Sequence, residues 1–163
     1  MNTQEAIVQT FGNQLRLRVC GLLIQNDRCL MIQHKSINES QAFFSPPGGG
    51  LKYGETIESR LKAEFLEETG LEIEVEKFLF FNEFLAPPLH AIELFYQVKQ
   101  QSGELSKGFD PELATDNQII EELHLFSLLE IQKISVNSRH QFFDFGANWE
   151  DILSLQGHFK KDF

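Results

Sequence analysis

Cysteine is scarce in this 163-residue sequence, which contains only Cys20 and Cys29. Both lie in apolar runs that look like strands, so we expect two buried free thiols. Two such residues indicate neither a disulfide framework nor a zinc cluster. Their scarcity argues against a small secreted protein held together by disulfides, and it leaves a reducing cytoplasm as the expected compartment.

Long apolar runs are also missing. No stretch of about 18 apolar residues occurs, so we expect no membrane-spanning helix. The first residues, MNTQEAIVQTF, lack the basic flank and apolar centre of a secretory signal. Both absences again favour a cytoplasmic protein.

Basic residues are few relative to acidic ones. The chain has 14 Lys and Arg against 24 Asp and Glu, a formal net charge of −10. A protein that binds nucleic acid or an anionic membrane without specificity needs a basic face, so we expect neither partner. An acidic protein still binds phosphates when divalent cations bridge the two. The surplus therefore hints at a metal, although a solvated acidic surface accounts for most of it.

The composition predicts a globular domain. Hydrophobic residues make up 42% of the chain, 16 Phe are present, and the length fits one domain over residues 1–163. Hydrophobic periodicity and turn residues then predict the elements. We expect an arm or helix within 1–14, strands over 15–25, 29–35, 71–85, 90–101 and 119–127, a polar loop over 36–41, helices over 56–69 and 128–134, and a C-terminal helical segment over 137–163. Together these describe an α+β sandwich.

The helix predicted over residues 56–69 carries an unusual charge pattern. Thr56 is a candidate N-cap and Gly70 a candidate C-terminal cap. At about 100° per residue, Glu64, Glu67 and Glu68 fall on one stripe. Arg60 lies on the same stripe, one turn before Glu64.

Three carboxylates on one side repel each other unless a positive charge lies among them. A hard divalent cation with oxygen ligands, such as Mg²⁺ or Mn²⁺, is the natural partner. The preceding glycines allow a tight turn and a close approach of the backbone to that cation or to a phosphate. A glutamate run alone is usually a solvated face, and three glycines alone are usually a loop. The two together at fixed spacing favour a metal site.

This stretch resembles the Nudix box, the signature of the Nudix (MutT-like) hydrolases. The box is Gly, five residues, Glu, seven residues, Arg-Glu-aliphatic, one residue, Glu-Glu, one residue, and Gly-aliphatic. Seven residues of this chain fall in register over the box's 23 positions: Gly49, Glu55, Glu64, Glu67, Glu68, Gly70 and Leu71. Phe65 takes the first aliphatic position, and PPGG before the box resembles the usual lead-in of the family.

The resemblance implies a fold and a reaction. The fold is an α/β/α sandwich with a mixed sheet between helices. The reaction is hydrolysis of a nucleoside diphosphate linked to another group, by a metal-activated water. The implied metal ligands are Glu67, Glu68, Glu64 (a ligand or the base) and the carbonyl of Gly48, with Gly49, Glu55 and Arg60 in supporting positions. The implied cofactor is Mg²⁺ or Mn²⁺, and the partners are a small nucleotide derivative and, where the protein associates, a second copy of the chain.

The chain departs from the box at Ala63, where the family has arginine. In the family that arginine is understood to hold the glutamates by charge pairing, and without it one carboxylate lacks a partner. We expect activity to survive, with Arg60 as the substitute. The alternative is a weakened Nudix domain that binds or regulates without turnover. An acidic scaffold with no ligand would make the box a coincidence.

Other substrate contacts are weakly indicated. Some family members use a further glutamate from a later loop or strand, and the candidates are Glu93, Glu112, Glu121 and Glu122. The aromatic residues that could stack on a base are Phe44, Tyr53, Phe81 and Phe84, although core packing is the commoner role. We expect His34 and His90 to be packed polar residues, and Lys35 and Lys52 to be exposed lysines. Pro87 follows the box by 16 residues, which resembles the ADP-ribose pyrophosphatase subgroup, but the glycine that often follows is missing.

Overall fold

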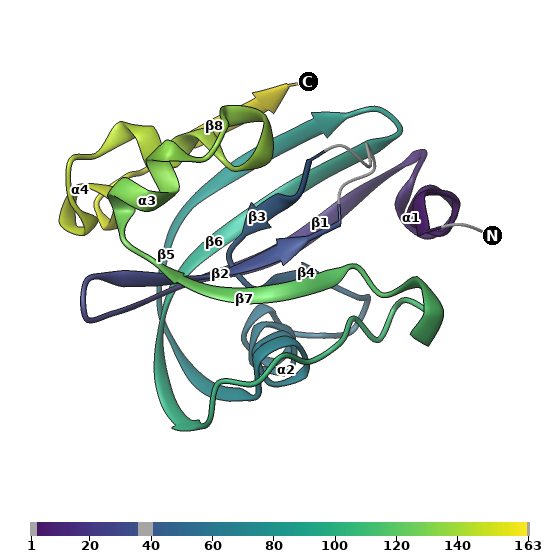
Figure 1. The fold of residues 1–163 in the computed structure, drawn as a ribbon, viewed down its shortest axis with the longest axis horizontal. Helices are drawn as coiled ribbons and strands as arrows, with labels where there is room; N and C mark the ends of the chain where they lie inside the picture. The colour runs from purple at the N-terminus through teal and green to yellow at the C-terminus, as the bar shows by residue number, and fades with distance from the viewer. Residues whose placement is uncertain (1–2, 36–40, 163) are drawn as a thin grey trace.

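A computed structural model describes residues 3–35 and 41–162, and it shows a curved sheet with helices on both faces (Figure 1). The strands are β1 (Gln14–Gln25), β2 (Arg28–His34), β3 (Phe43–Ser45), β4 (Gly48–Gly50), β5 (Leu71–Ala86), β6 (Leu89–Gly103), β7 (Ile120–Phe126) and β8 (His158–Asp162). The helices are α1 (Thr3–Phe11), α2 (Ile57–Thr69), α3 (Leu128–Lys133) and α4 (Trp149–Leu153), with 3₁₀ turns η1 (Thr115–Asn117), η2 (Val136–Ser138) and η3 (Gln141–Phe145).

The sheet is mixed. Its main path runs β3-β2-β1-β6-β5-β8, while β4 pairs with β1 and β7 pairs with β2. The pairs β1–β6 and β5–β8 are parallel, and the other pairs are antiparallel. This arrangement confirms the predicted α+β sandwich with a mixed sheet between helices.

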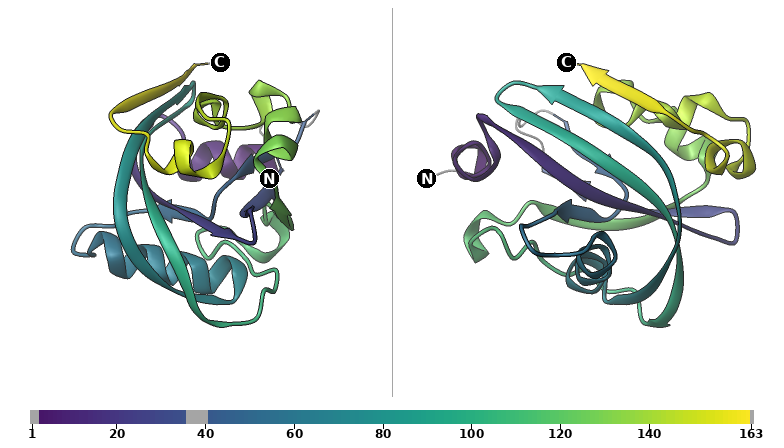
Figure 2. Two further views of the ribbon diagram at one scale, coloured as in Figure 1. Left: turned by 90° about the vertical axis from the view of Figure 1, so that its left-hand side faces the viewer. Right: turned by 180° about the vertical axis from the view of Figure 1, so that it is seen from behind.

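The two faces of β1 pack against different helices. Val19 and Leu23 point to one face, where they join Phe65 of α2 in one buried cluster. Cys20 and Leu22 point to the other face and join a second cluster under the C-terminal helices. Figure 2 shows α2 on one side of the sheet and the C-terminal helices on the other. Alternation along one strand therefore builds both halves of the sandwich.

The N-terminal segment is a helix, one of the two forms predicted for it. On α1, the buried residues Ile7 and Phe11 pack with Leu113 from the loop that follows β6. This contact lays α1 beside that loop and, as shown below, against a cavity. The predicted polar loop over 36–41 lies outside the described residues except for Gln41.

The C-terminal segment corrects one prediction. Its helices η3 and α4 are present, but residues 158–162, predicted within a helical segment over 137–163, form β8 instead. β8 pairs in parallel with residues 81–85 of β5, so its backbone is satisfied by a distant strand. A five-residue polar stretch such as HFKKD carries no local signal of that pairing.

The phenylalanine-rich part of this segment packs inside the molecule. Phe142 and Phe143 are fully buried, and Phe142 contacts Phe80 and Phe95 on β5 and β6 edge-on, with ring centroids 4.7 and 4.8 Å apart. Phe145 remains exposed. Among the described residues, no helix has both the length and the apolar character needed to cross a bilayer.

Candidate active site

Helix α2 carries the glutamate-rich stretch, and the predicted residues fix its ends. The Thr56 hydroxyl accepts a hydrogen bond from the Ser59 N–H at 3.1 Å, in a capping box. Gly70 adopts the left-handed conformation (φ 73°) and its N–H donates to the Leu66 carbonyl. The helix therefore begins and ends where the sequence predicts.

The apolar face of α2 is pressed closely onto β1. Leu61 and Phe65 are fully buried, and a Cβ added at Gly21 would lie 2.5 Å from the Phe65 ring. Only glycine allows this approach. With its apolar face fixed there, the helix turns its charged stripe toward the glycines of β4.

Arg60 binds two glutamates of the stripe. Its Nε donates to Glu64 Oε1 at 2.7 Å, and its Nη2 donates to Glu64 as well and to Glu67 Oε2 at 2.9 Å. Glu55 Oε1 lies 3.8 Å from Nη1. Burial alone would lower the pKa of Arg60, but the hydrogen bonds and charges of these glutamates outweigh it and raise that pKa. The contact that Arg60 needs in order to replace a box arginine is present.

Glu68 is held by the glycine strand. The Gly48 N–H donates to Glu68 Oε2 at 3.0 Å, and both residues are buried. A Cβ at Gly49 would lie 1.9 Å from Glu64 Oε1, so any other residue there would displace that carboxylate. Burial, and then the charge of Glu64, raise the pKa of Glu68 well above its ordinary range. β4 therefore forms a close rim around two buried carboxylates.

The chemistry of these donors fits a hard divalent cation. Glu64, Glu67 and Glu68 supply carboxylate oxygens, Gly48 supplies a carbonyl, and Mg²⁺ and Mn²⁺ prefer such ligands. Burial, opposed in part by Arg60, also raises the pKa of Glu64. Among residues 3–35 and 41–162, no three acidic, histidine or cysteine side chains already converge on one ion. Arg60 and the Gly48 N–H hold the glutamates instead, and the glutamate side chains would have to turn to bind a cation.

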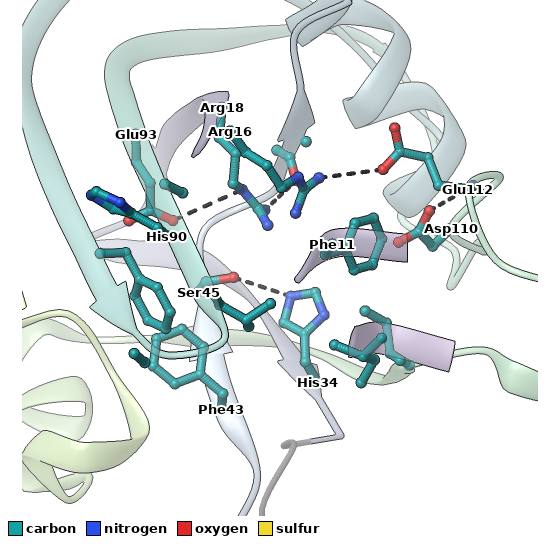
Figure 3. A pocket seen from close by; sticks show the side chains of 18 of the residues that line it. Phe11, Arg16, Arg18, His34, Phe43, Ser45, His90, Glu93, Asp110 and Glu112 are labelled. Atoms are coloured by element: carbon teal, nitrogen blue, oxygen red, sulfur yellow. Dashed lines mark hydrogen bonds and ion pairs between the residues drawn. The ribbon is translucent and has the colours of Figure 1, made fainter. Parts of the chain in front are cut away.

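A cavity of about 300 Å³ opens beside Glu64 and Glu68. Arg16 and Arg18 of β1 project into it from the same face of the strand (Figure 3). Arg18 Nη2 donates to the Gly48 carbonyl at 2.9 Å, which connects the cavity to the glycine rim. Two guanidinium groups beside a carboxylate cluster form a candidate phosphate subsite.

A buried polar cluster lies behind Arg18. Glu93 of β6 is hydrogen-bonded to His140 Nε2 at 2.7 Å and to Asn82 Nδ2 at 3.0 Å. Its other oxygen lies 3.8 Å from Arg18 Nε, a buried nitrogen that has no hydrogen-bond partner among the described residues. Burial raises the pKa of Glu93, but the charges and hydrogen bonds of its neighbours, led by those of His140, lower it by more. Arg18 is thus bonded to the rim on one side and faces a carboxylate on the other.

Arg16 is placed differently. Its guanidinium lies 4.1 Å from the centroid of the Phe11 ring, and its Nη2 pairs with Glu112 at 3.3 Å. Burial, with some help from Arg18, lowers the pKa of Arg16 to about 10. Lys52 also lies 3.7 Å from Glu112. Arg16 therefore connects the N-terminal helix to the loop that follows β6.

The structure divides the weaker candidates into two groups. Six of them line the cavity: His34, Lys35, Phe84, His90, Glu93 and Glu112. The other six do not line it: Phe44, Lys52, Tyr53, Phe81, Glu121 and Glu122. Of these, Glu121 accepts a hydrogen bond from Gln33 at 2.8 Å. His34 and His90 are hydrogen-bonded to Ser45 and Glu83, as expected of packed polar residues, and both also line the cavity.

Arg16, Arg18 and Phe11 are the residues that sequence reasoning missed. The alternation in LRLRVCG predicts a strand, and its two arginines, two residues apart, must share one face of it. Two cations on one face of an apolar strand were an available signal. The position of Phe11 carried no such signal, because it depends on how α1 packs against a loop about 100 residues later.

The family is shown by comparison with known proteins. The profile of the NUDIX domain matches residues 14–145, so the chain belongs to the NUDIX family. An ADP-ribose pyrophosphatase of Methanocaldococcus jannaschii is 32% identical over 94 residues, which cover 56% of this chain and 55% of that protein. The chain therefore matches about half the length of this relative.

Solved structures show the same fold. A NUDIX hydrolase from Nitrosomonas europaea aligns with a TM-score of 0.63 at 18% identity, covering 78% of this chain and 82% of that one. A MutT NUDIX hydrolase from Burkholderia pseudomallei aligns with a TM-score of 0.59 at 25% identity, covering 71% of this chain and 84% of that one. The resemblance seen in the glutamate helix thus extends to the fold of most of the chain.

Proposed function

We propose that this Nudix hydrolase domain cleaves a nucleoside diphosphate linked to another group, with Mg²⁺ or Mn²⁺ as cofactor. The observation that carries the proposal is the juxtaposition of two sites. Glu64 and Glu68 lie at a glycine rim, and the cavity beside them contains Arg16 and Arg18. The carboxylates can bind a cation, and the neighbouring guanidinium groups can bind phosphates. A diphosphate that spans the two sites would contact both.

Glu64, Glu67, Glu68 and the Gly48 carbonyl would hold the cation. When bound, the cation polarises a phosphoryl oxygen and makes water more acidic. The attacking water loses a proton as its oxygen bonds to phosphorus, and we assign that proton to Glu64, which lies against Gly49. The bond from this phosphorus to the bridging oxygen breaks, and the other phosphate leaves with that oxygen. Arg60 holds Glu64 and Glu67 in position, while Arg16 and Arg18 bind and orient the phosphates.

ADP-ribose is the first substrate to test. The relative named ADP-ribose pyrophosphatase supports this choice, and Pro87, the residue of the subgroup resemblance, lines the cavity.

Cys20 and Cys29 are free and buried, which favours a reducing compartment. We therefore place the reaction in the cytoplasm. A homodimer stays a prediction.

The test uses the purified chain with a panel of nucleoside diphosphate derivatives, with Mg²⁺ or Mn²⁺, and follows phosphate after phosphatase coupling. We expect turnover that Glu67→Gln lowers more than about 100-fold, beyond the loss typical of residues outside the ligand set. Glu58→Gln is the matched control. It makes the same change on the same helix, but Glu58 is exposed and pairs only with Lys62 among the described residues.

Each outcome separates the readings left open by Ala63. Ligand-induced thermal stabilisation without turnover would favour the weakened binding module. If neither turnover nor stabilisation is observed, the acidic scaffold is the remaining interpretation and the proposal is overturned. Equal loss in Glu67→Gln and Glu58→Gln would show that helix charge, rather than a ligand set, is being measured.

A further inference from the structure

The cavity has two unlike sides. Figure 3 shows Arg16, Arg18, Glu93 and Glu112 together on one side, and Phe43, Ser45 and His34 on the other. Much of the rest of the lining is apolar, and we call this part the apolar side: Ile7, Phe43, Phe84, Leu89 and Ile119, with Phe11 next to Arg16. A diphosphate bound at the arginines would place its attached group against this apolar side. The volume, about 300 Å³, is at the small end for ligand pockets and fits a compact group.

One hydrogen-bonded pair interrupts the apolar side. His34 ends β2 and Ser45 ends β3. Antiparallel pairing of the two strands sets His34 opposite Phe43 and Ser45 opposite Ile32, so the two side chains are neighbours. His34 Nε2 lies 3.0 Å from Ser45 Oγ. The hydroxyl fixes the imidazole ring, which lines the cavity.

His34 is uncharged at neutral pH. Burial lowers the pKa of His34 to about 3, and the positive charge of Arg18 lowers it in the same direction. A neutral imidazole has one nitrogen that donates and one that accepts a hydrogen bond. It therefore suits the polar edge of an uncharged ring, but it supplies no positive charge for a phosphate.

The other charged groups that line the cavity point to the same kind of ligand. Asp110 and Glu112 line the cavity from the loop between β6 and β7, and Arg16 is already paired with Glu112. Lys35 also lines the cavity but is exposed. A second phosphate on the apolar side would lose water to a neutral wall, and the carboxylates that line the cavity would repel it. An uncharged ring would incur neither cost.

We propose that His34, fixed by Ser45, is a specificity-determining residue that hydrogen-bonds to the polar edge of a nucleobase held between the apolar side chains of this cavity. The inference rests on the proposed function and narrows its substrate class. The substrates are diphosphates whose nucleobase enters the cavity, and compounds that carry a further phosphate at that end are excluded. Hydrogen-bonding sites of this kind discriminate strongly against ligands that lack the matching group.

The test compares ADP-ribose with its abasic analogue, in which hydrogen replaces adenine, using the full chain with Mg²⁺ or Mn²⁺. His34→Phe keeps a flat ring and removes the hydrogen bond. We expect it to raise KM for ADP-ribose about 3- to 10-fold, as for loss of one hydrogen bond, with kcat changed less than about two-fold. KM for the abasic analogue should not change. His124→Phe is the matched control, because His124 lies on β7 and is hydrogen-bonded to Gln33 outside the cavity.

Three results would overturn the inference: equal loss with both compounds, no loss with either, or a wild-type preference for a diphosphate phosphorylated at the ring end. Ser45→Ala removes only the hydroxyl and decides the question if His34→Phe does not fold, and it should raise KM for ADP-ribose alone. If the wild type turns over no diphosphate, the proposed function fails on its own. In that case we compare the thermal stabilisation produced by ADP-ribose with that produced by the abasic analogue, in wild type and in His34→Phe. Stronger stabilisation of the wild type by ADP-ribose, lost in the variant, supports the inference. Any other pattern overturns it.

Discussion

Arg60 and Arg18 both hold groups of the proposed metal site, but they are built into the molecule in opposite ways. Arg60 bonds to Glu64 and Glu67 on its own helix, within seven residues. Arg18 bonds to the Gly48 carbonyl, 30 residues away, and its Nε faces Glu93 at 3.8 Å. One arginine closes a local network, and the other faces a cavity. The comparison shows that local networks place the ligands, while long-range contacts shape the substrate side.

The largest effect should come from Arg60→Ala measured without metal. The side chains of Arg60 and Glu64 are each only 6% exposed, and removing one partner of a buried pair leaves an uncompensated charge. We expect the free energy of unfolding to fall by about 3 kcal/mol in urea titrations with chelator. Added Mg²⁺ should recover part of the loss, because the cation supplies the missing charge.

Lys62→Ala is the control for Arg60→Ala on the same helix. Lys62 pairs with Glu58 at the surface, where such pairs contribute only about 0.3–0.5 kcal/mol. A loss in Arg60→Ala no larger than that in Lys62→Ala would contradict the local network.

A smaller effect is expected for Arg18→Ala. The variant loses the hydrogen bond that holds the Gly48 carbonyl in position, and it removes one positive charge from the cavity. Turnover should therefore fall about 10- to 100-fold, as for other residues that orient ligands. Arg18→Lys keeps the charge and should recover part of the turnover. Recovery is measured as kcat/KM with ADP-ribose. Full activity in Arg18→Ala would show that the arginine does not act on the rim.

The cluster behind Arg18 should respond to pH. The pKa of Glu93 is lowered on balance by its neighbours. The Glu93 carboxylate therefore stabilises the fold at pH values above the ordinary glutamate pKa of about 4.3. That contribution is lost as pH falls through the lowered pKa of the folded state. The difference in unfolding free energy between wild type and Glu93→Gln should therefore hold steady near pH 5 and shrink toward pH 3. A difference that does not change with pH would show that Glu93 is not an ion-pair partner.

The smallest effect is expected when the box arginine is restored. Ala63→Arg adds a cation where Arg60 already satisfies Glu64 and Glu67, so a further pair is worth little. Turnover should change less than about five-fold. A gain well beyond that would mean that Ala63 had weakened the site.

The sequence predicted the local parts of this molecule well. α2, its caps, and the contact between Arg60 and Glu64 follow from helical spacing, because residues four apart must meet on one face. The strands β1, β2, β5, β6 and β7 and the mixed sheet also follow from periodicity and resemblance.

The parts it missed depend on distant contacts. β8 forms because β5 has an open edge, and His34 lines the cavity because α1 and the loop after β6 close over it. No short pattern encodes either arrangement. Arg16 and Arg18 lie between these cases, since their alternation was visible in the sequence and only its meaning required the fold.

The most direct measurement titrates Mg²⁺ against turnover of ADP-ribose in wild type, Arg60→Ala and Arg60→Ala/Ala63→Arg. If Arg60 does the work of the absent box arginine, the single variant loses about 10- to 100-fold in turnover and metal affinity, and the double variant recovers much of both. Unchanged metal affinity and turnover in Arg60→Ala would contradict the account.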